Sequence, residues 1–216
     1  MFTKTLRSMT LAVAFALGTP FLATAAGPNG PRVPVVVPYV APTAEEAIDL
    51  AYMREEEKFA RDLYLRLAEA WDAAPFDFVA NAEQSHMDAV LRLLRKYRLV
   101  DPAAGNLVGE FTDPELQALY TALLQRGLST PLEALKVGGL VEEVDLLDLE
   151  VSASRTVKTD MLTMYANLAC GSRNHLRAFA AGIRAVTGQA YVAQSMSQAT
   201  VDAILAQSWE RCGRAW

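Results

Sequence analysis

The run from Thr43 to Ala74 most constrains the fold of this chain, because it contains neither proline nor glycine and repeats apolar residues at helical spacing. Thr43 followed by Glu46 is a capping-box pattern, which favours the start of a helix. The Ala74-Pro75 pair is typical of a helix end. The sequence therefore predicts one long helix over this run.

Similar patterns predict three further long helices, over about 78–99, from 130 to 150 or a little beyond, and over about 157–186. The crossover between the second and third of the four carries its own short helix, with Asp113 as N-cap and Pro114 in the first helical position. A terminal helix is expected over about 197–209. These patterns indicate an all-α fold, a four-helix bundle of ferritin-like topology with a long crossover and a C-terminal helix.

The N-terminus has the three-part layout of a secretory signal peptide, which we expect to be cleaved near Ala25. Residues 26–42 are rich in proline and read as a linker, and the bundle domain is predicted over 43–210. No later segment is uniformly apolar, so we expect an exported protein, periplasmic or secreted, whose mature chain is not stably inserted in a membrane.

The charge balance argues against nucleic acid as a partner. The formal net charge is -5, and loss of Lys4 and Arg7 with the signal peptide would make it about -7. An acidic chain repels a phosphate backbone, so we expect no nucleic-acid binding.

Ionisable residues interrupt the apolar stripe of every predicted long helix. They are Glu57 on the first helix, Glu83 and His86 on the second, Glu142 and Asp145 on the third, and His175 on the fourth. The fourth stripe reads Leu168, Ser172, His175, Phe179, Gly182 and Val186. Burying isolated charges costs on the order of several kcal/mol per ion, so this set requires either shared protons or a compensating cation.

Carboxylate oxygens together with imidazole suit iron, manganese or zinc. Di-iron bundles take one Glu from each of two helices and a Glu-x-x-His from each of the other two. Here the set has the full complement of four carboxylates and two imidazoles, but Ser172 stands where the fourth helix would supply its Glu. Asp145, one turn after Glu142, is the expected substitute.

Two acidic runs leave a choice of residue. Only one of Glu55, Glu56 and Glu57 is expected to face inward; Glu57 lies on the apolar stripe and Glu56 is the alternative. Glu142 is preferred to Glu143 because Asp145 lies one turn beyond it on the same face. Near this set, Tyr64 is either a packing aromatic or a hydrogen-bonding or redox-active neighbour.

The two cysteines, Cys170 and Cys212, leave two alternatives open. In an oxidising compartment they form a disulfide that ties the C-terminal tail to a helix, or they are two unrelated buried thiols.

Several blocks of the sequence resemble known proteins. Glu83-Gln-Ser-His86 is similar to the second-helix ligand pair of rubrerythrin and other ferritin-like carboxylate proteins, and Glu142-Glu-Val-Asp145 to the third-helix acid pair of rubrerythrin. The blocks that resemble the ferritin-like family catalogued as domain of unknown function 2202 are Met53-Arg-Glu-Glu-Glu-Lys58, Ser85-His-Met-Asp88, Val137-Gly-Gly-Leu-Val-Glu-Glu-Val-Asp145 and Gly171-Ser-Arg-Asn-His-Leu-Arg-Ala-Phe179. This resemblance covers roughly Ala44 to Leu205. Because ferritin-like bundles commonly pair, it also implies a homodimer.

Three functions follow as hypotheses. The first is a di-iron carboxylate centre that handles iron or reacts with oxygen or peroxide, as an oxidase or peroxidase-type oxidoreductase does; without Cys-x-x-Cys pairs, it would need an outside electron donor. The second is a protein that binds a single zinc or manganese ion. The third is a metal-free structural or interaction module with protonated core acids.

Overall fold

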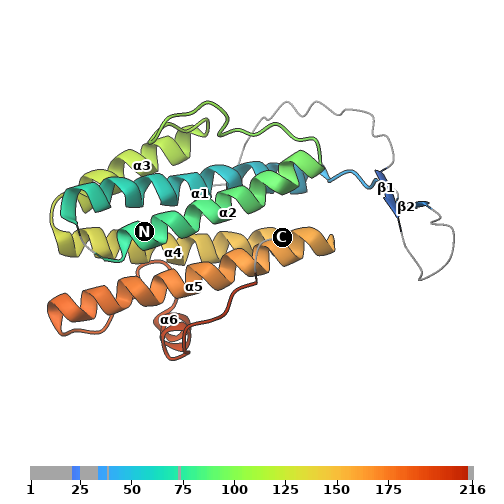
Figure 1. Ribbon diagram of the computed structural model, residues 1–216. Helices are drawn as coiled ribbons and strands as arrows, with labels where there is room; N and C mark the ends of the chain where they lie inside the picture. The colour runs from blue at the N-terminus through green and yellow to red at the C-terminus, as the bar shows by residue number, and fades with distance from the viewer. Residues whose placement is uncertain (1–20, 25–33, 38, 73, 214–216) are drawn as a thin grey trace.

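Four long helices lie side by side and enclose the core of the molecule (Figure 1). The computed structural model describes residues 21–24, 34–37, 39–72 and 74–213. The long helices are α1 (Ala44–Trp71), α2 (Phe76–Lys96), α4 (Pro131–Ser154) and α5 (Thr159–Thr187). The shorter ones are α3 (Pro114–Gly127) and α6 (Gln198–Leu205). From residue 39 onward, the described chain is helical, as the sequence predicts.

Local capping chemistry explains where the helices begin and end. The Thr43 side chain accepts a hydrogen bond from the backbone N–H of Glu46, whose carboxylate accepts one from the Thr43 N–H in return. Asp113 and Thr130 cap α3 and α4 by accepting hydrogen bonds from backbone N–H groups of the first turn, and each is followed by proline in the first helical position. Helix α1 ends at Trp71, before the expected boundary at Ala74-Pro75, because Asp72 adopts a left-handed conformation.

The bundle is assembled from two helix pairs. Helix α1 packs against α2, and α4 packs against α5, each pair being joined by a short turn. Contacts between α1 and α4 and between α2 and α5 close the bundle, and α3 lies across α1 and α4. The long crossover therefore covers the outer side of α1, as Figure 1 shows.

The apolar core is divided into two clusters along the bundle. One includes Phe59, Leu63, Phe76, Leu176 and Phe179, and the other includes Leu50, Met53, Val90, Leu94 and Leu168. On each long helix, the ionisable residues of the stripe fall between members of these two clusters. The fold therefore holds a polar layer between two apolar ones.

A few sequence predictions need correction. Val186, placed on the inner stripe of α5, is 62 % exposed and lies in the last turn of that helix. The terminal helix ends at Leu205 rather than near Trp209, and the remaining described residues of the tail run without regular structure. The described part of the chain contains no helix that is long and apolar enough to cross a membrane.

The N-terminal segment contains the only strands among the described residues. Strands β1 (Phe21–Thr24) and β2 (Pro34–Val37) pair antiparallel, with Phe21 opposite Val37. They fall within the expected signal peptide and linker. The rest of the expected signal peptide, including the predicted cleavage position, lies outside the described residues.

Candidate metal centre

The six ionisable residues that the sequence places on the inner stripes come together in one layer of the bundle. Five of them are at most 6 % exposed; the side chain of His86, at 12 %, is the sixth. They are Glu57 on α1, Glu83 and His86 on α2, Glu142 and Asp145 on α4, and His175 on α5. Every long helix therefore contributes to a single buried cluster.

Five of these residues form two groups of potential metal ligands that share one carboxylate. Glu57, Glu83 and His86 make the first group, and Glu83, Glu142 and His175 make the second. Within each group, one potential ligand atom from each residue lies within 4.8 Å of the others. Glu83 belongs to both groups, so it stands at the centre of the cluster.

The two carboxylate oxygens of Glu83 face the two imidazoles separately. Its Oε2 atom lies 2.7 Å from Nδ1 of His86, and its Oε1 atom lies 2.8 Å from Nδ1 of His175. The imidazole rings are 5.5 Å apart, centroid to centroid. Nδ1 of His86 also lies 3.2 Å from Glu57, and Nδ1 of His175 lies 3.4 Å from Glu142. The Nδ1 atoms of both rings therefore point into the carboxylate layer.

Three buried polar atoms of this cluster have no hydrogen-bond partner among the described residues. They are Oε1 of Glu57, Oδ1 of Asp145 and Nδ1 of His175. The last lies close to carboxylate oxygens, yet not in hydrogen-bonding geometry. Because buried polar atoms are nearly always hydrogen-bonded, three such atoms in one layer call for another partner.

The electrostatics of the cluster centre on Glu83. Burial raises the pKa of Glu83, but the imidazolium charges of His175 and His86 outweigh it and hold that pKa well below the usual range. Burial lowers the pKa of His175, but Glu83 and Glu142 reverse this effect and raise the pKa to about 10. In the same way, Glu83 and Glu57 raise the pKa of His86. Without a metal, both imidazoles are therefore protonated at neutral pH.

The other carboxylates respond to burial and to one another. Burial raises the pKa of Glu57 to about 7 despite the neighbouring imidazole of His86. Burial and the charge of Glu83 raise the pKa of Glu142. Burial, Glu57 and Glu142 raise the pKa of Asp145 well above its usual value. The metal-free cluster therefore takes up protons to offset its negative charge.

Asp145 belongs to neither three-residue group, although its charge interacts with both Glu57 and Glu142. Ser172 lies close enough to the Asp145 carboxylate to lower its pKa slightly against the larger raising effects, and its hydroxyl donates to the backbone carbonyl of Leu168 at 2.9 Å. Ser172 therefore lies on α5 in the layer of the cluster, beside Asp145 of α4. That Asp145 substitutes for a fourth-helix Glu stays a prediction.

Tyr64 and Gly171 lie against residues of the cluster, although neither belongs to the predicted set. The Tyr64 hydroxyl donates a 2.6 Å hydrogen bond to Oε1 of Glu142, so it is a hydrogen-bonding neighbour. A Cβ atom at Gly171 would lie 2.4 Å from Nε2 of His86, so only glycine lets that ring approach α5. Sequence spacing singled out Tyr64, whereas nothing in the pattern marked Gly171.

The acidic runs contain more buried carboxylates than we expected. Glu55 and Glu56 are buried together with Glu57, but of the three it is Glu57 that joins the cluster of carboxylates and histidines, as the stripe predicts. Glu55 accepts hydrogen bonds from the backbone N–H groups of Thr112 and Asp113, because the crossover covers the outer side of α1. Glu143 is also fully buried, beneath the loop that precedes α6.

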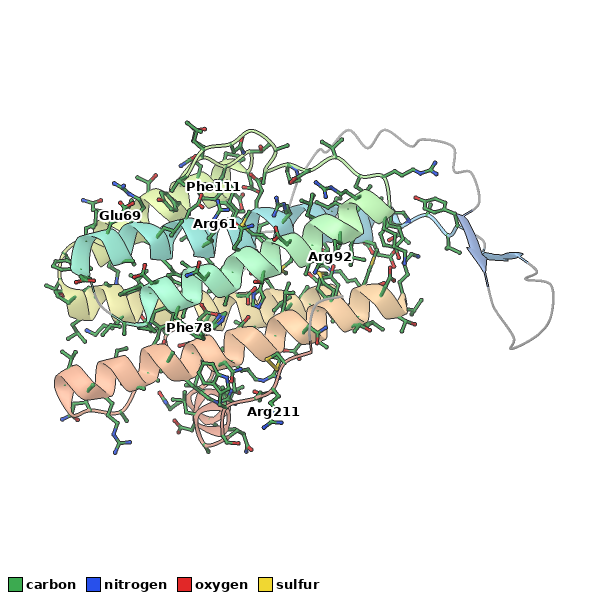
Figure 2. The ribbon with its side chains drawn as sticks, viewed as in Figure 1. Arg61, Glu69, Phe78, Arg92, Phe111 and Arg211 are labelled. Carbon is green, nitrogen blue, oxygen red and sulfur yellow. A yellow bond between two sulfur atoms is a disulfide. The ribbon has the colours of Figure 1, made fainter. Side chains whose placement is uncertain are left out.

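An open groove of about 580 Å³ between α2 and α5 leads to the two imidazoles. His86, Gly171 and His175 line its inner part, while Phe78 and Arg92 of α2 line its outer part (Figure 2). This groove therefore connects solvent to the two imidazoles of the cluster.

A family profile, the sequence of another protein and a crystal structure each match most of this chain. The sequence profile described as an uncharacterized protein domain, DUF2202, matches residues 46–208. The uncharacterized protein MJ0754 of Methanocaldococcus jannaschii is 41 % identical over 167 residues, which is 77 % of this chain and 90 % of that protein. The crystal structure of the hypothetical protein MJ0754 is similar, with a TM-score of 0.77 and 40 % identity; the match covers 81 % of this chain and 99 % of that one.

Proposed function

We propose a metal-binding function for this chain, which belongs to the family defined by the uncharacterized protein domain DUF2202. In this proposal, the chain is a ferritin-like carboxylate protein that holds two iron ions and either reacts with oxygen or peroxide or handles iron. The helical bundle and its cluster of carboxylates and histidines support the proposal.

The observation that carries this proposal is the convergence of partnerless atoms in one buried layer. Glu57, Asp145 and His175 each have an atom without a hydrogen-bond partner in the described chain, and all three residues lie among the predicted ligands. Leaving such atoms buried costs about 1–3 kcal/mol each, so a fold retains them where a ligand compensates. A cation is the partner that carboxylate oxygens and imidazole nitrogens have in common.

The donor set fits two ions better than one. Glu83 presents one oxygen to each imidazole, so it would be shared, with Glu57 and His86 on one side and Glu142 and His175 on the other. Asp145 would complete the set. Carboxylates combined with imidazoles suit iron and manganese, and zinc is also compatible. A bound redox-active pair would supply electrons for the reduction of oxygen or peroxide.

The residues of the chain would prepare this site in three ways. Tyr64 orients Glu142 through its hydrogen bond, which fixes the carboxylate before any ion arrives. The two apolar clusters exclude water from either side of the layer. The imidazoles of His86 and His175 carry protons in the metal-free chain and would release them when a cation binds.

One observation favours a second candidate, a site for a single zinc or manganese ion. Ser172 supplies no carboxylate, so the α5 side of the cluster has His175 alone as a donor. The group of Glu83, Glu142 and His175 is the more deeply buried of the two and would hold one ion by itself.

Metal stoichiometry distinguishes these candidates. The full chain would be purified without chelator, loaded anaerobically with ferrous iron, and subjected to elemental analysis. We expect two irons per chain, lost in His175→Ala and retained in Glu143→Gln, a matched variant of a buried acid outside the cluster. One ion per chain would favour the second candidate, and no bound metal under any loading would refute both.

We also propose that the chain is exported to an oxidising compartment. Of the two alternatives for the cysteines, the structure contains the disulfide, which joins Cys170 of α5 to Cys212 of the tail. Disulfides persist mainly in oxidising compartments. Fractionation of the source cells would test this: recovery of the chain in the cytoplasm with reduced thiols would contradict export.

A further inference from the structure

The last described residues of the chain form a strap over the entrance to the proposed metal site. We define the C-terminal strap as residues 206–213, which follow α6 and run back along α5 (Figure 1). Trp209, Glu210, Cys212 and Gly213 of the strap line the same groove as His86 and His175. The strap therefore forms part of the wall of the access route.

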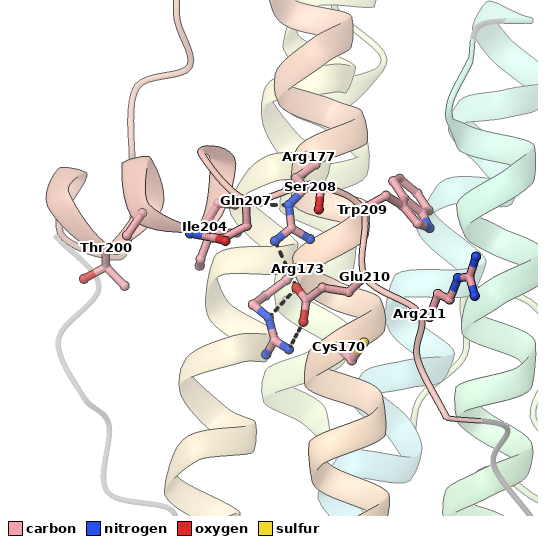
Figure 3. Close-up of a pocket in the computed structure, with 11 residues that line it drawn as sticks. Cys170, Arg173, Arg177, Thr200, Ile204, Gln207, Ser208, Trp209, Glu210 and Arg211 are labelled. Atoms are coloured by element: carbon pink, nitrogen blue, oxygen red, sulfur yellow. Dashed lines mark hydrogen bonds and ion pairs between the residues drawn. The ribbon is translucent and has the colours of Figure 1, made fainter.

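Three independent contacts fix the strap to α5. The disulfide joins Cys212 to Cys170, and the carboxylate of Glu210 is held between Arg173 and Arg177, with N–O distances of 2.5 to 2.9 Å (Figure 3). Asn174 donates to the backbone carbonyl of Glu210 and accepts from its N–H, at 3.0 Å in both cases. The strap is thus anchored firmly on one wall of the groove.

On the opposite wall, the strap meets α2 through an aromatic contact. The ring of Trp209 projects from the strap toward α2 (Figure 3) and lies 5.9 Å, centroid to centroid, from the ring of Phe78. Both side chains remain more than half exposed, at 53 % and 56 %. An aromatic contact of this kind contributes about 0.5–1.5 kcal/mol beyond area burial, so it breaks far more easily than the anchors on α5.

We infer that Trp209 limits which molecules reach His86 and His175 and thereby restricts the proposed centre to small oxidants such as hydrogen peroxide. The inference rests on the proposed function, because it assigns a role to the entrance of that same site. Its basis is the position of the indole: it bridges the two walls of the groove, and the strap that carries it is fixed on one wall only.

Chemical modification of the histidines tests this inference without a metal. The chain has only two histidines, and both line the groove, so carbethoxylation of imidazole by diethyl pyrocarbonate reports on access to this site. The reagent attacks only the neutral ring, so the rates of all variants are compared at one alkaline pH, where part of each imidazole has lost its proton. In the metal-free protein, Trp209→Ala should raise the modification rate at least about threefold, as expected when a lid is removed. Phe78→Ala should act in the same direction, while Val186→Ala, an exposed α5 variant remote from the groove, should not.

Reaction with peroxides of different size then tests the restriction itself. In ferrous-loaded protein, Trp209→Ala should increase the rate with cumene hydroperoxide relative to the rate with hydrogen peroxide. Unchanged histidine modification in both groove variants would overturn the inference, as would an unchanged ratio of peroxide rates. A chain that binds no iron but shows faster histidine modification would refute the proposed function and still support the role of Trp209 in access.

Discussion

Two sets of buried carboxylates in this protein have opposite surroundings. Both oxygens of Glu143 accept hydrogen bonds, from the Tyr191 hydroxyl and from the backbone N–H groups of residues 194–196. Asp62 likewise accepts from Lys58, Arg61 and the backbone N–H of Gly109. Glu57 and Asp145, in contrast, each keep an oxygen without a partner among the described residues.

The difference shows that the hydrogen-bond partners of a buried carboxylate indicate its role. A carboxylate whose oxygens are all satisfied by fixed donors holds loops in place, as Glu143 holds the segment before α6. A carboxylate that faces other carboxylates and imidazoles, with atoms left without a partner, is one for which we propose a cation as the partner. Burial alone does not separate the two classes, because both are almost fully enclosed.

We call Glu143 and Asp62, whose oxygens accept hydrogen bonds from fixed donors, the satisfied set. The largest expected effect concerns Asp62 of this set. Lys58→Met removes the ammonium group that donates to Asp62 and to the backbone carbonyls of Leu107 and Glu110. Breaking a buried ion pair from one side leaves an uncompensated charge, so we expect a loss of about 3 kcal/mol in the free energy of unfolding. Urea denaturation of the metal-free protein measures this. Lys58 and Asp62 lie outside the proposed metal centre, so the number of irons bound per chain should be unchanged in this variant.

The next effect concerns the carboxylates of the proposed metal centre, among which Glu142 groups with Glu83 and His175. Glu142→Gln removes a proposed ligand and also relieves repulsion with Glu83. Because loss of an outer-shell partner alone typically costs 10–100-fold in metal affinity, we expect a loss of at least about 100-fold here. Titration against a competing chelator measures the affinity. Stability of the metal-free variant should be equal to or above that of the parent chain, and a strong decrease would place Glu142 in the satisfied set.

The neighbouring substitution Glu143→Gln is the matched control. Its amide NH₂ group would face backbone N–H donors that now bind a carboxylate oxygen. We expect the free energy of unfolding to fall by about 2 kcal/mol, since buried donors lose their acceptor. Metal affinity should remain at the parent value, so a large loss of affinity in this variant would break the distinction between the two sets.

The smallest expected effect is on pH dependence. The pKa of Glu57 is raised from 4.5 to about 7, and that of His175 from 6.5 to about 10. The folded metal-free chain therefore binds more protons than the unfolded chain between pH 5 and 9, so its free energy of unfolding falls as pH rises, by on the order of 1 kcal/mol per pH unit. Thermal unfolding at pH 6 and pH 8 measures this. A thermal midpoint of the metal-free protein that is higher at pH 8 than at pH 6 would contradict the raised pKa values of Glu57 and His175.

Sequence patterns were sufficient for the inner faces of the bundle. The stripe of α1 predicts Leu50, Met53, Glu57, Tyr64 and Leu67 as inward-facing, and all are buried. The same alignment predicts that the six candidate residues lie in one layer, which is where the structure places them. Helical periodicity carries this information because neighbouring long helices bury complementary stripes.

The outer faces were not predictable in this way. Glu55 and Glu143 are buried because the crossover and the loop before α6 fold over them, and loop paths leave no periodic signal in the sequence. The strap and the role of Gly171 depend on tertiary contacts between segments that are distant in the sequence. Composition identified the two cysteines but left open whether they pair.

Anomalous X-ray diffraction at the iron absorption edge, from crystals of the iron-loaded protein, tests the central claim most directly. The account predicts two anomalous peaks per chain, one beside Nδ1 of His86 and one beside Nδ1 of His175, with Glu83 between them and no peak at Glu143. The absence of any peak in this layer, or a peak only at carboxylates outside it, would contradict the claim that this cluster of carboxylates and histidines is a metal centre.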